Sequence, residues 1–75
     1  MNCKDFLDGI TTFLTGERPA IRIVEDDSGA IIHITPAGRV SSLIGANGAT
    51  INAIRVLAKA LGYNGKHRIK ILLDE

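Results

Sequence analysis

Two glycines three positions apart, Gly45 and Gly48, interrupt an otherwise apolar and helical stretch near the middle of this chain. Apolar residues precede the glycines, and a helical period follows them from Ile51 to Leu61. Because glycine has no Cβ, a backbone with only small residues between two glycines can turn tightly, expose its amides and admit a bulky neighbour. The stretch predicts a short helix, a tight turn and a longer helix, around which the remaining chain must fold.

The spacing of the glycines is not specific by itself. Gly62 and Gly65 also satisfy Gly-x-x-Gly, but no helical period follows them. We interpret that second pair as a plain loop, so the flanking helices, and not the glycines alone, distinguish the first pair.

The N-terminal segment predicts an amphipathic helix over residues 3–15, which Asn2 can cap and Gly16 can end. Its apolar residues fall on one stripe at helical spacing: Phe6, Leu7, Ile10, Phe13 and Leu14. We expect this stripe, including both aromatic rings, to lie in the core.

Two runs rich in β-branched residues, 20–24 and 30–35, flank the polar turn 25–29, which predicts an antiparallel hairpin. Ile32 and Ile34 would face the core. His33 would lie on the other face, with no second ligand or base near it in sequence, so we interpret it as a strand surface residue.

Thr35 and Pro36 are typical of a helix start and predict a helix reaching Ile44, with Val40, Leu43 and Ile44 inward. The following helix would bury the apolar face Ile51, Ile54, Leu57, Ala58 and Leu61. Its opposite face would expose Asn52, Arg55 and Lys59. Residues 68–73 alternate as a final strand. The order is therefore αββααβ, an α+β fold in one domain spanning residues 1–75.

Charge is distributed unevenly, although the net charge is only +1. The first 27 residues hold six acidic and three basic residues, whereas residues 28–73 hold six basic residues and no acid. This asymmetry indicates a polyanionic partner that approaches the second half of the chain.

Several function classes find no support in the residues. A P-loop or a dinucleotide fingerprint would need glycine and lysine spacings that are absent. No metal cluster, carboxylate pair or nucleophile–base pair is indicated, so we expect neither an enzyme nor a cofactor. No apolar run approaches the ~18 residues of a membrane span, and no signal pattern begins the chain. With the lone Cys3, this favours a cytoplasmic protein.

Two other modes of nucleic-acid recognition fit poorly. A helix-turn-helix reader normally gains its core from a third helix, whereas strands bracket this helix pair. Binders that stack bases on aromatic platforms are disfavoured, because Tyr63 is the one aromatic residue outside the expected core.

The segment with Val40, Ile44, Gly45, Gly48 and Ile51 resembles the core motif of KH domains, in which a Gly-x-x-Gly loop clamps the backbone of about four single-stranded nucleotides. The αββααβ order resembles the type II KH fold, which implies a three-stranded mixed sheet with the helices packed on one face. The resemblance covers essentially the whole chain and extends to the small stand-alone bacterial KH proteins, the KhpA family. It implies a cytoplasmic RNA chaperone or post-transcriptional regulator.

The resemblance implies a single-stranded RNA site formed by Arg39, Val40, Leu43, Ile44, Gly45, Ala46, Asn47, Gly48, Asn52, Arg55 and Lys59. Val40, Leu43 and Ile44 would form an apolar floor for bases. Lys66, Arg68 and Lys70 could add charge. The acidic turn 25–27 would correspond to a loop that flanks the cleft.

The resemblance also implies a homodimer, or a heterodimer with a larger KH-containing protein. Family loops often carry a basic residue between the glycines, whereas this chain has Ala46 and Asn47. That difference and the acidic turn leave an alternative open, a KH-like pairing module with weak or lost RNA binding.

Overall fold

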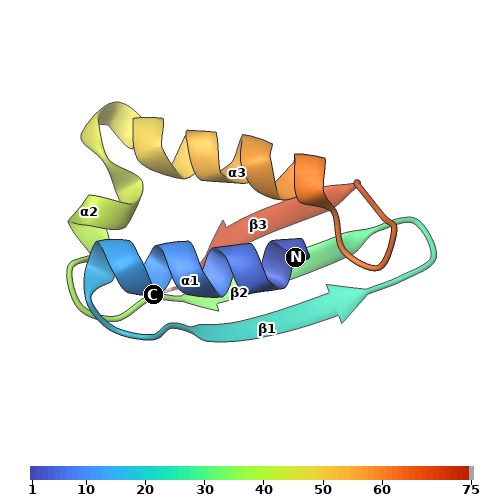
Figure 1. The fold of residues 1–75 in the computed structure, drawn as a ribbon, viewed down its shortest axis with the longest axis horizontal. Helices are drawn as coiled ribbons and strands as arrows, with labels where there is room; N and C mark the ends of the chain where they lie inside the picture. The colour runs from blue at the N-terminus through green and yellow to red at the C-terminus, as the bar shows by residue number, and fades with distance from the viewer. Residues whose placement is uncertain (75) are drawn as a thin grey trace.

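The computed structural model describes residues 1–74 as a two-layer α+β fold (Figure 1). The elements follow in the order α1 (Cys3–Thr15), β1 (Ala20–Glu25), β2 (Ala30–Thr35), α2 (Val40–Ile44), a 3-10 turn (Ala46–Gly48), α3 (Ala49–Leu61) and β3 (Ile69–Leu73). The predicted αββααβ order is confirmed. None of the helices in this part of the chain is both long and apolar enough to cross a bilayer.

The three strands form one mixed sheet in the order β1-β2-β3. The predicted hairpin is confirmed, since β1 pairs antiparallel with β2 and Ile23 lies opposite Ile32. β3 pairs parallel with β2, with Ile71 beside Ile32. A parallel pairing needs a crossover connection, which the helices α2 and α3 supply.

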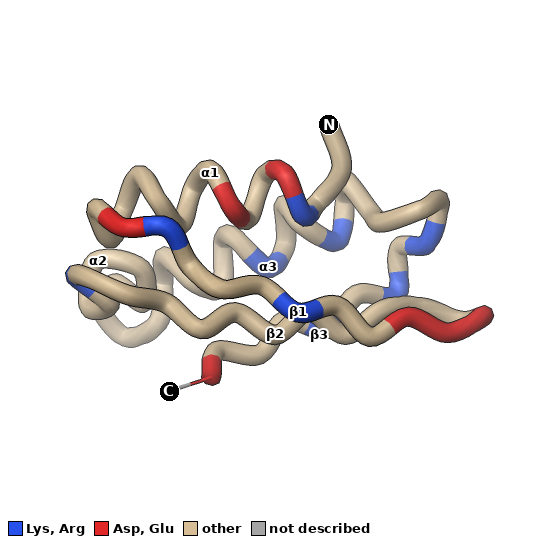
Figure 2. The backbone as a smooth tube through the Cα atoms, turned by 90° about the horizontal axis from the view of Figure 1, so that it is seen from below, with Lys and Arg blue, Asp and Glu red and all other residues tan. Residues whose placement is uncertain are grey.

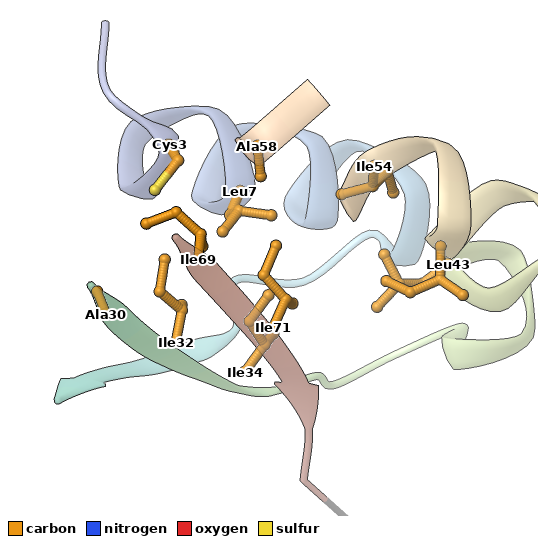
Figure 3. Packing of buried hydrophobic residues seen from close by; sticks show 11 residues of the cluster. Cys3, Leu7, Ala30, Ile32, Ile34, Leu43, Ile54, Ala58, Ile69 and Ile71 are labelled. Atoms are coloured by element: carbon orange, nitrogen blue, oxygen red, sulfur yellow. The ribbon is translucent and has the colours of Figure 1, made fainter. Parts of the chain in front are cut away.

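The core lies between this sheet and the helices (Figure 3). Ile32 and Ile34 of β2 are fully buried, as their alternation predicts, and Ile69 and Ile71 of β3 lie beside them. The helices cover one face of the sheet, and Figure 2 shows them on one side of the strands. The outward-facing side chains of the other face include Arg22, Val24, Ile31 and Lys70.

The first helix has the predicted ends but not the predicted buried face. Asn2 Oδ1 accepts a hydrogen bond from the Asp5 amide, and Gly16 ends the helix with a positive φ. The buried row is Cys3, Leu7, Thr11 and Thr15, whose members are four residues apart. Cys3 and Leu7 of this row belong to the same core cluster as Ile32 and Ile69 of the sheet (Figure 3). The expectation that both aromatic rings are core residues is therefore wrong: Phe6 is half-buried, and Phe13 is 81% exposed.

The predicted helix start at Pro36 is also wrong, because α2 begins only at Val40. Gly38 has a φ of +71°, and the Arg39 amide donates to the Thr15 carbonyl oxygen at 2.9 Å. Residues 36–39 thus dock against the end of α1, and this contact replaces the first turn of the expected helix.

The last helix, α3, has the predicted bounds but buries a narrower face than expected. Ile51, Ile54 and Ala58 are buried, whereas Leu57 is 53% exposed and Leu61 is 41% exposed. That flank of α3 stays uncovered within residues 1–74, although α3 packs against α1, α2 and β3.

Candidate nucleic-acid interface

The turn between α2 and α3 has a backbone that few residues other than glycine and asparagine adopt. Gly45, Asn47 and Gly48 have φ values of +77°, +55° and +76°. The Gly48 amide donates back to the Gly45 carbonyl, and the Ala49 amide donates to Ala46. These bonds fix the turn at the start of α3.

The amides of Ala46 and Asn47 have no hydrogen-bond acceptor in the described chain. Both residues are exposed. They lie directly before α3, whose first turn contains no acidic residue, so the positive end of the helix dipole is uncompensated. Free amides at a helix start are suited to bind an anionic oxygen.

Glycine is required at the two positions of this turn for different structural reasons. A Cβ on Gly45 would lie 2.7 Å from Thr50 Cβ and 2.9 Å from the Thr50 nitrogen, so this glycine lets the turn pack on α3. A Cβ on Gly48 would meet only Asn52 Nδ2, at 3.8 Å. Gly48 is therefore needed for its backbone conformation, and the space above it is open to a ligand.

The predicted apolar floor is only partly accessible. Leu43 is fully buried, so its expected contact with bases is wrong: its side chain belongs to the core that joins α1 to α3. Val40 is half-buried, and Ile44 is 39% exposed, although it was expected to point inward. These two side chains leave an apolar surface next to the turn.

The predicted polar face of α3 lies along the free edge of β3. The Arg55 Nε–H donates to the Ile71 carbonyl at 3.3 Å, and its Nη1 donates to Asn52 Oδ1 at 3.4 Å. Arg55 is consequently half-buried and directed by the strand, and not freely exposed as expected. Lys59, one turn further, and Arg39, before α2, are exposed and available.

The acidic turn does not flank this interface, which corrects the expectation from the resemblance. Figure 2 shows the acidic residues at the end of the β1–β2 hairpin, far from α2. Glu25 Oε2 contacts Lys66 Nζ at 3.2 Å and accepts a hydrogen bond from Asn64 at 3.0 Å, both beyond the end of α3. Since α3 has 13 residues, about 20 Å separate this turn from Gly48.

Two carboxylates of that turn, those of Glu25 and Asp26, are held in their charged form. Hydrogen bonds from Asn64 and then from Lys66 lower the pKa of Glu25. The Ser28 hydroxyl, followed by the amides of Ser28 and Gly29, lowers the pKa of Asp26. Lys66 also donates to the Asp26 carbonyl. Its charge is therefore engaged here, and Lys70 points from the uncovered face of the sheet, so neither adds charge beside Gly48.

Two titratable groups have neighbours that sequence reasoning missed. His33 Nδ1 lies 3.1 Å from Asp74 Oδ2, because the parallel pairing of β3 brings the end of the chain back beside β2. A separation of 41 residues gave no local signal for this pair. Burial raises the pKa of the Cys3 thiol, which lies in the core and away from the turn.

Comparison of the chain with protein-family models, with curated proteins and with solved structures found no match.

Proposed function

We propose that this chain is a type II KH-like domain that binds single-stranded RNA through its Gly45–Gly48 turn. The observation that carries the proposal is the pair of unpartnered amides, on Ala46 and Asn47, at the acid-free start of α3. The residues of the resemblance and the αββααβ order with its mixed sheet support it.

The binding mode follows from the chemistry of each part. Phosphate oxygens accept from the free amides, and the sugar–phosphate chain passes over Gly48, where no Cβ obstructs it. Val40 and Ile44 offer bases an apolar contact without hydrogen-bonding groups. Arg39 and Lys59 attract phosphates, and Arg55 borders the strand edge. Because these contacts recognise backbone and hydrophobic surface, the binding discriminates little between sequences, which fits an RNA chaperone or post-transcriptional regulator.

The test replaces Ala46 and Asn47 together by aspartate. Both residues are exposed, and aspartate tolerates the left-handed conformation of Asn47, so the circular dichroism of the variant should match that of the wild type. Two carboxylates beside the free amides should abolish binding to a short single-stranded RNA at low salt. Asn64→Asp, which adds a charge at the other glycine pair, should leave binding unchanged. A double variant that binds as well as the wild type would refute the clamp.

Salt dependence measures the number of phosphates engaged. Two or three phosphate contacts predict a log–log slope of roughly −1.4 to −2 for single-stranded RNA. A fourfold increase in salt should then weaken binding about seven- to sixteen-fold. A slope near zero in a fluorescence-anisotropy titration would contradict phosphate recognition.

The alternative is a domain that pairs with proteins and has weak or lost RNA binding. A specific observation favours pairing: two large apolar side chains, Phe13 of α1 and Leu57 of α3, are exposed. A stable dimer with no RNA affinity at low salt would support the alternative, because the clamp requires measurable binding under those conditions.

A further inference from the structure

Two asparagines of this chain are followed directly by glycine, Asn47 by Gly48 and Asn64 by Gly65. Such pairs are prone to deamidation, because glycine has no side chain to hinder the attack of its backbone nitrogen on the asparagine side chain. Both asparagines are exposed, with φ values of +55° and +50°. The chain thus holds the same chemistry twice in the same local conformation, so the surroundings decide which site reacts.

We propose that Asn47, and not Asn64, is a site of spontaneous deamidation in the folded protein, and that the reaction places a carboxylate in the Gly45–Gly48 turn. The inference about the reaction does not depend on RNA binding. Only its consequence for RNA rests on the proposed function.

The reaction consumes water and needs no cofactor. Hydroxide removes the proton from the Gly48 backbone nitrogen, which then forms a bond to Cγ of Asn47. The Cγ–Nδ2 bond breaks, and the side-chain nitrogen takes a proton from water and leaves as ammonia, so a succinimide ring remains. Water opens the ring at the Cγ–N bond to give aspartate, or at the bond between the backbone carbonyl carbon and nitrogen to give isoaspartate. The net change is water consumed and ammonia released, without oxidation or reduction.

The charges around the two sites differ. The attacking nitrogen and the tetrahedral intermediate are anionic, so a nearby carboxylate slows the reaction and positive charge accelerates it. Asn64 Nδ2 donates to Glu25 Oε2 at 3.0 Å, which places a carboxylate against the group that is attacked, and Lys66 offsets part of this charge. Gly48 caps α3, whose first turn contains no acidic residue, so the positive end of the helix dipole lies beside Asn47.

Asn64 is also held more firmly. The attack requires the side chain and the following peptide to rotate, which breaks the bonds that fix them. The Asn64 side chain would have to leave Glu25, and Tyr63 and Lys66 exchange backbone hydrogen bonds of 2.8 and 2.9 Å across its turn. A hydrogen bond to a carboxylate is about twice as strong as one between neutral groups, so this bond stabilises the unreactive conformation.

Asn47 is held by a weaker contact. Its side chain is exposed and has no hydrogen-bond partner within residues 1–74. The Gly48 amide must leave the Gly45 carbonyl, but this bond is long, at 3.3 Å. The Gly65 amide lacks an acceptor, which is the feature that favours the other site. Because a neutral exposed hydrogen bond contributes less than a charge-assisted one, we expect Asn47 to react at least about fivefold faster.

The product carries a negative charge where the proposed clamp would hold a phosphate. A carboxylate at position 47 lies beside the free amides of Ala46 and Asn47 and at the positive start of α3, and both favour it. It competes with phosphate for these groups. The converted chain should therefore bind a short single-stranded RNA about two- to five-fold more weakly, as expected for one exposed charge pair. The RNA affinity of the protein would then decrease with its age.

The experiment follows both sites in the full chain by peptide mapping. The folded protein is incubated in mildly alkaline buffer, and trypsin then separates the sites into peptides 40–55 and 60–66. Fragment spectra measure conversion, and an isoaspartyl methyltransferase detects isoaspartate. Asn47 should convert at least about fivefold faster than Asn64. In urea the two rates should approach each other, because glycine follows both. Conversion of Asn64 as fast as Asn47 in the folded protein would overturn the proposal, and so would a rate ratio that urea leaves unchanged.

Glu25→Gln is the matched control. It removes the carboxylate beside Asn64, so it should raise the rate at Asn64 and leave the rate at Asn47 unchanged. An unchanged rate at Asn64 would contradict the electrostatic argument. RNA affinity of the incubated wild type is measured in parallel and should fall in step with conversion at Asn47. Conversion with constant RNA affinity would refute the clamp and this regulation, whereas absence of conversion would refute the modification site alone.

Discussion

The two Gly-x-Asn-Gly segments of this chain have nearly the same backbone and opposite surroundings. Gly45 and Gly62 share φ values of +77° and +73° with extended ψ, and the asparagines that follow, Asn47 and Asn64, are both left-handed. The first segment leads into a helix and leaves two amides without acceptors. Local sequence thus produced the same turn twice, and the amides of Asn64 and Gly65 in the second copy also lack acceptors, so the two copies differ in what surrounds them.

The second segment forms a small turn whose two ends are hydrogen-bonded to each other. The Tyr63 amide donates to the Lys66 carbonyl at 2.8 Å, and the Lys66 amide donates back at 2.9 Å. Asn64 and Gly65, both at positive φ, form the two-residue turn that an Asn-Gly hairpin favours. The side chains of Asn64 and of the following Lys66 contact Glu25, so a carboxylate lies beside this segment and would repel a phosphate. The helix that follows Gly48 and the absence of a nearby acid, and neither the glycine spacing nor free amides alone, therefore distinguish the candidate site.

The first glycine of each segment should be the most sensitive to substitution. Gly45→Ala and Gly62→Ala each combine a backbone conformation reserved for glycine with a close contact, to Thr50 and to the Lys66 carbonyl at 2.7 Å. The free energy of unfolding should fall by about 3–5 kcal/mol in each. Urea denaturation measures this. Gly9→Ala, inside α1 with open space around it, should instead stabilise by up to about 1 kcal/mol.

Substitutions of the glycine at the fourth position of each segment should separate effects on stability from effects on RNA binding. Gly48 and Gly65 have φ values of +76° and +79°, and a Cβ would meet little or nothing at either. Replacement by alanine should cost about 1–2 kcal/mol at both positions. Only Gly48→Ala should also weaken RNA binding, because its Cβ lies where the phosphate chain passes. Equal RNA affinities of the two folded variants would erase the proposed distinction between the segments.

Replacing one asparagine in each segment by aspartate compares the two segments through a single added charge. Asn47→Asp and Asn64→Asp introduce the same group into the same backbone conformation. A carboxylate next to the free amides should weaken RNA binding about two- to five-fold, as expected for one exposed charge pair. Asn64→Asp should leave the affinity unchanged. Parallel anisotropy titrations at low salt decide this, and a loss of affinity in Asn64→Asp would place RNA on the second segment instead.

The smallest expected effect concerns pH and the carboxylates near the second segment. Hydrogen bonds from Asn64 and then from Lys66 lower the pKa of Glu25 below its ordinary value of 4.5. Its contribution to stability is therefore complete above that value and is lost as the pH falls through the lower folded-state pKa. Glu25→Gln should flatten the decrease in the thermal midpoint below about pH 4.5 and leave RNA affinity at neutral pH unchanged. If the thermal midpoint of the variant falls with pH as steeply as that of the wild type, this role of Glu25 is contradicted.

Element order and most element boundaries follow from the sequence, because periodicity and capping are local. Asn2, Gly16 and Gly62 mark the helix ends that the structure has. The buried face of α1 was not predictable in this way. The stripe containing Phe6 and Phe13 has the right period, but the sheet lies under the row of Leu7 and Thr11, and periodicity does not specify which side of a broad apolar arc meets the sheet.

Within the candidate site, the sequence located the turn but not the accessibility of its neighbours. Leu43 and Ile44 are adjacent and similar in character, yet the first is fully buried and the second is 39% exposed, because α2 packs against α1 and α3 with Leu43 in the core. Arg55 could be placed on the polar face of α3, but its bond to the Ile71 carbonyl required the position of β3.

The sequence by itself determined the two glycine turns, since the left-handed preferences of glycine and asparagine act within a few residues. Only the tertiary structure decided their availability. The hairpin of β1 and β2 brings Glu25 to the second turn across 39 residues of chain, whereas no acidic residue lies in the first turn of the helix that follows Gly48. Contacts between distant segments depend on how whole elements pack, and local conformational preference does not encode them.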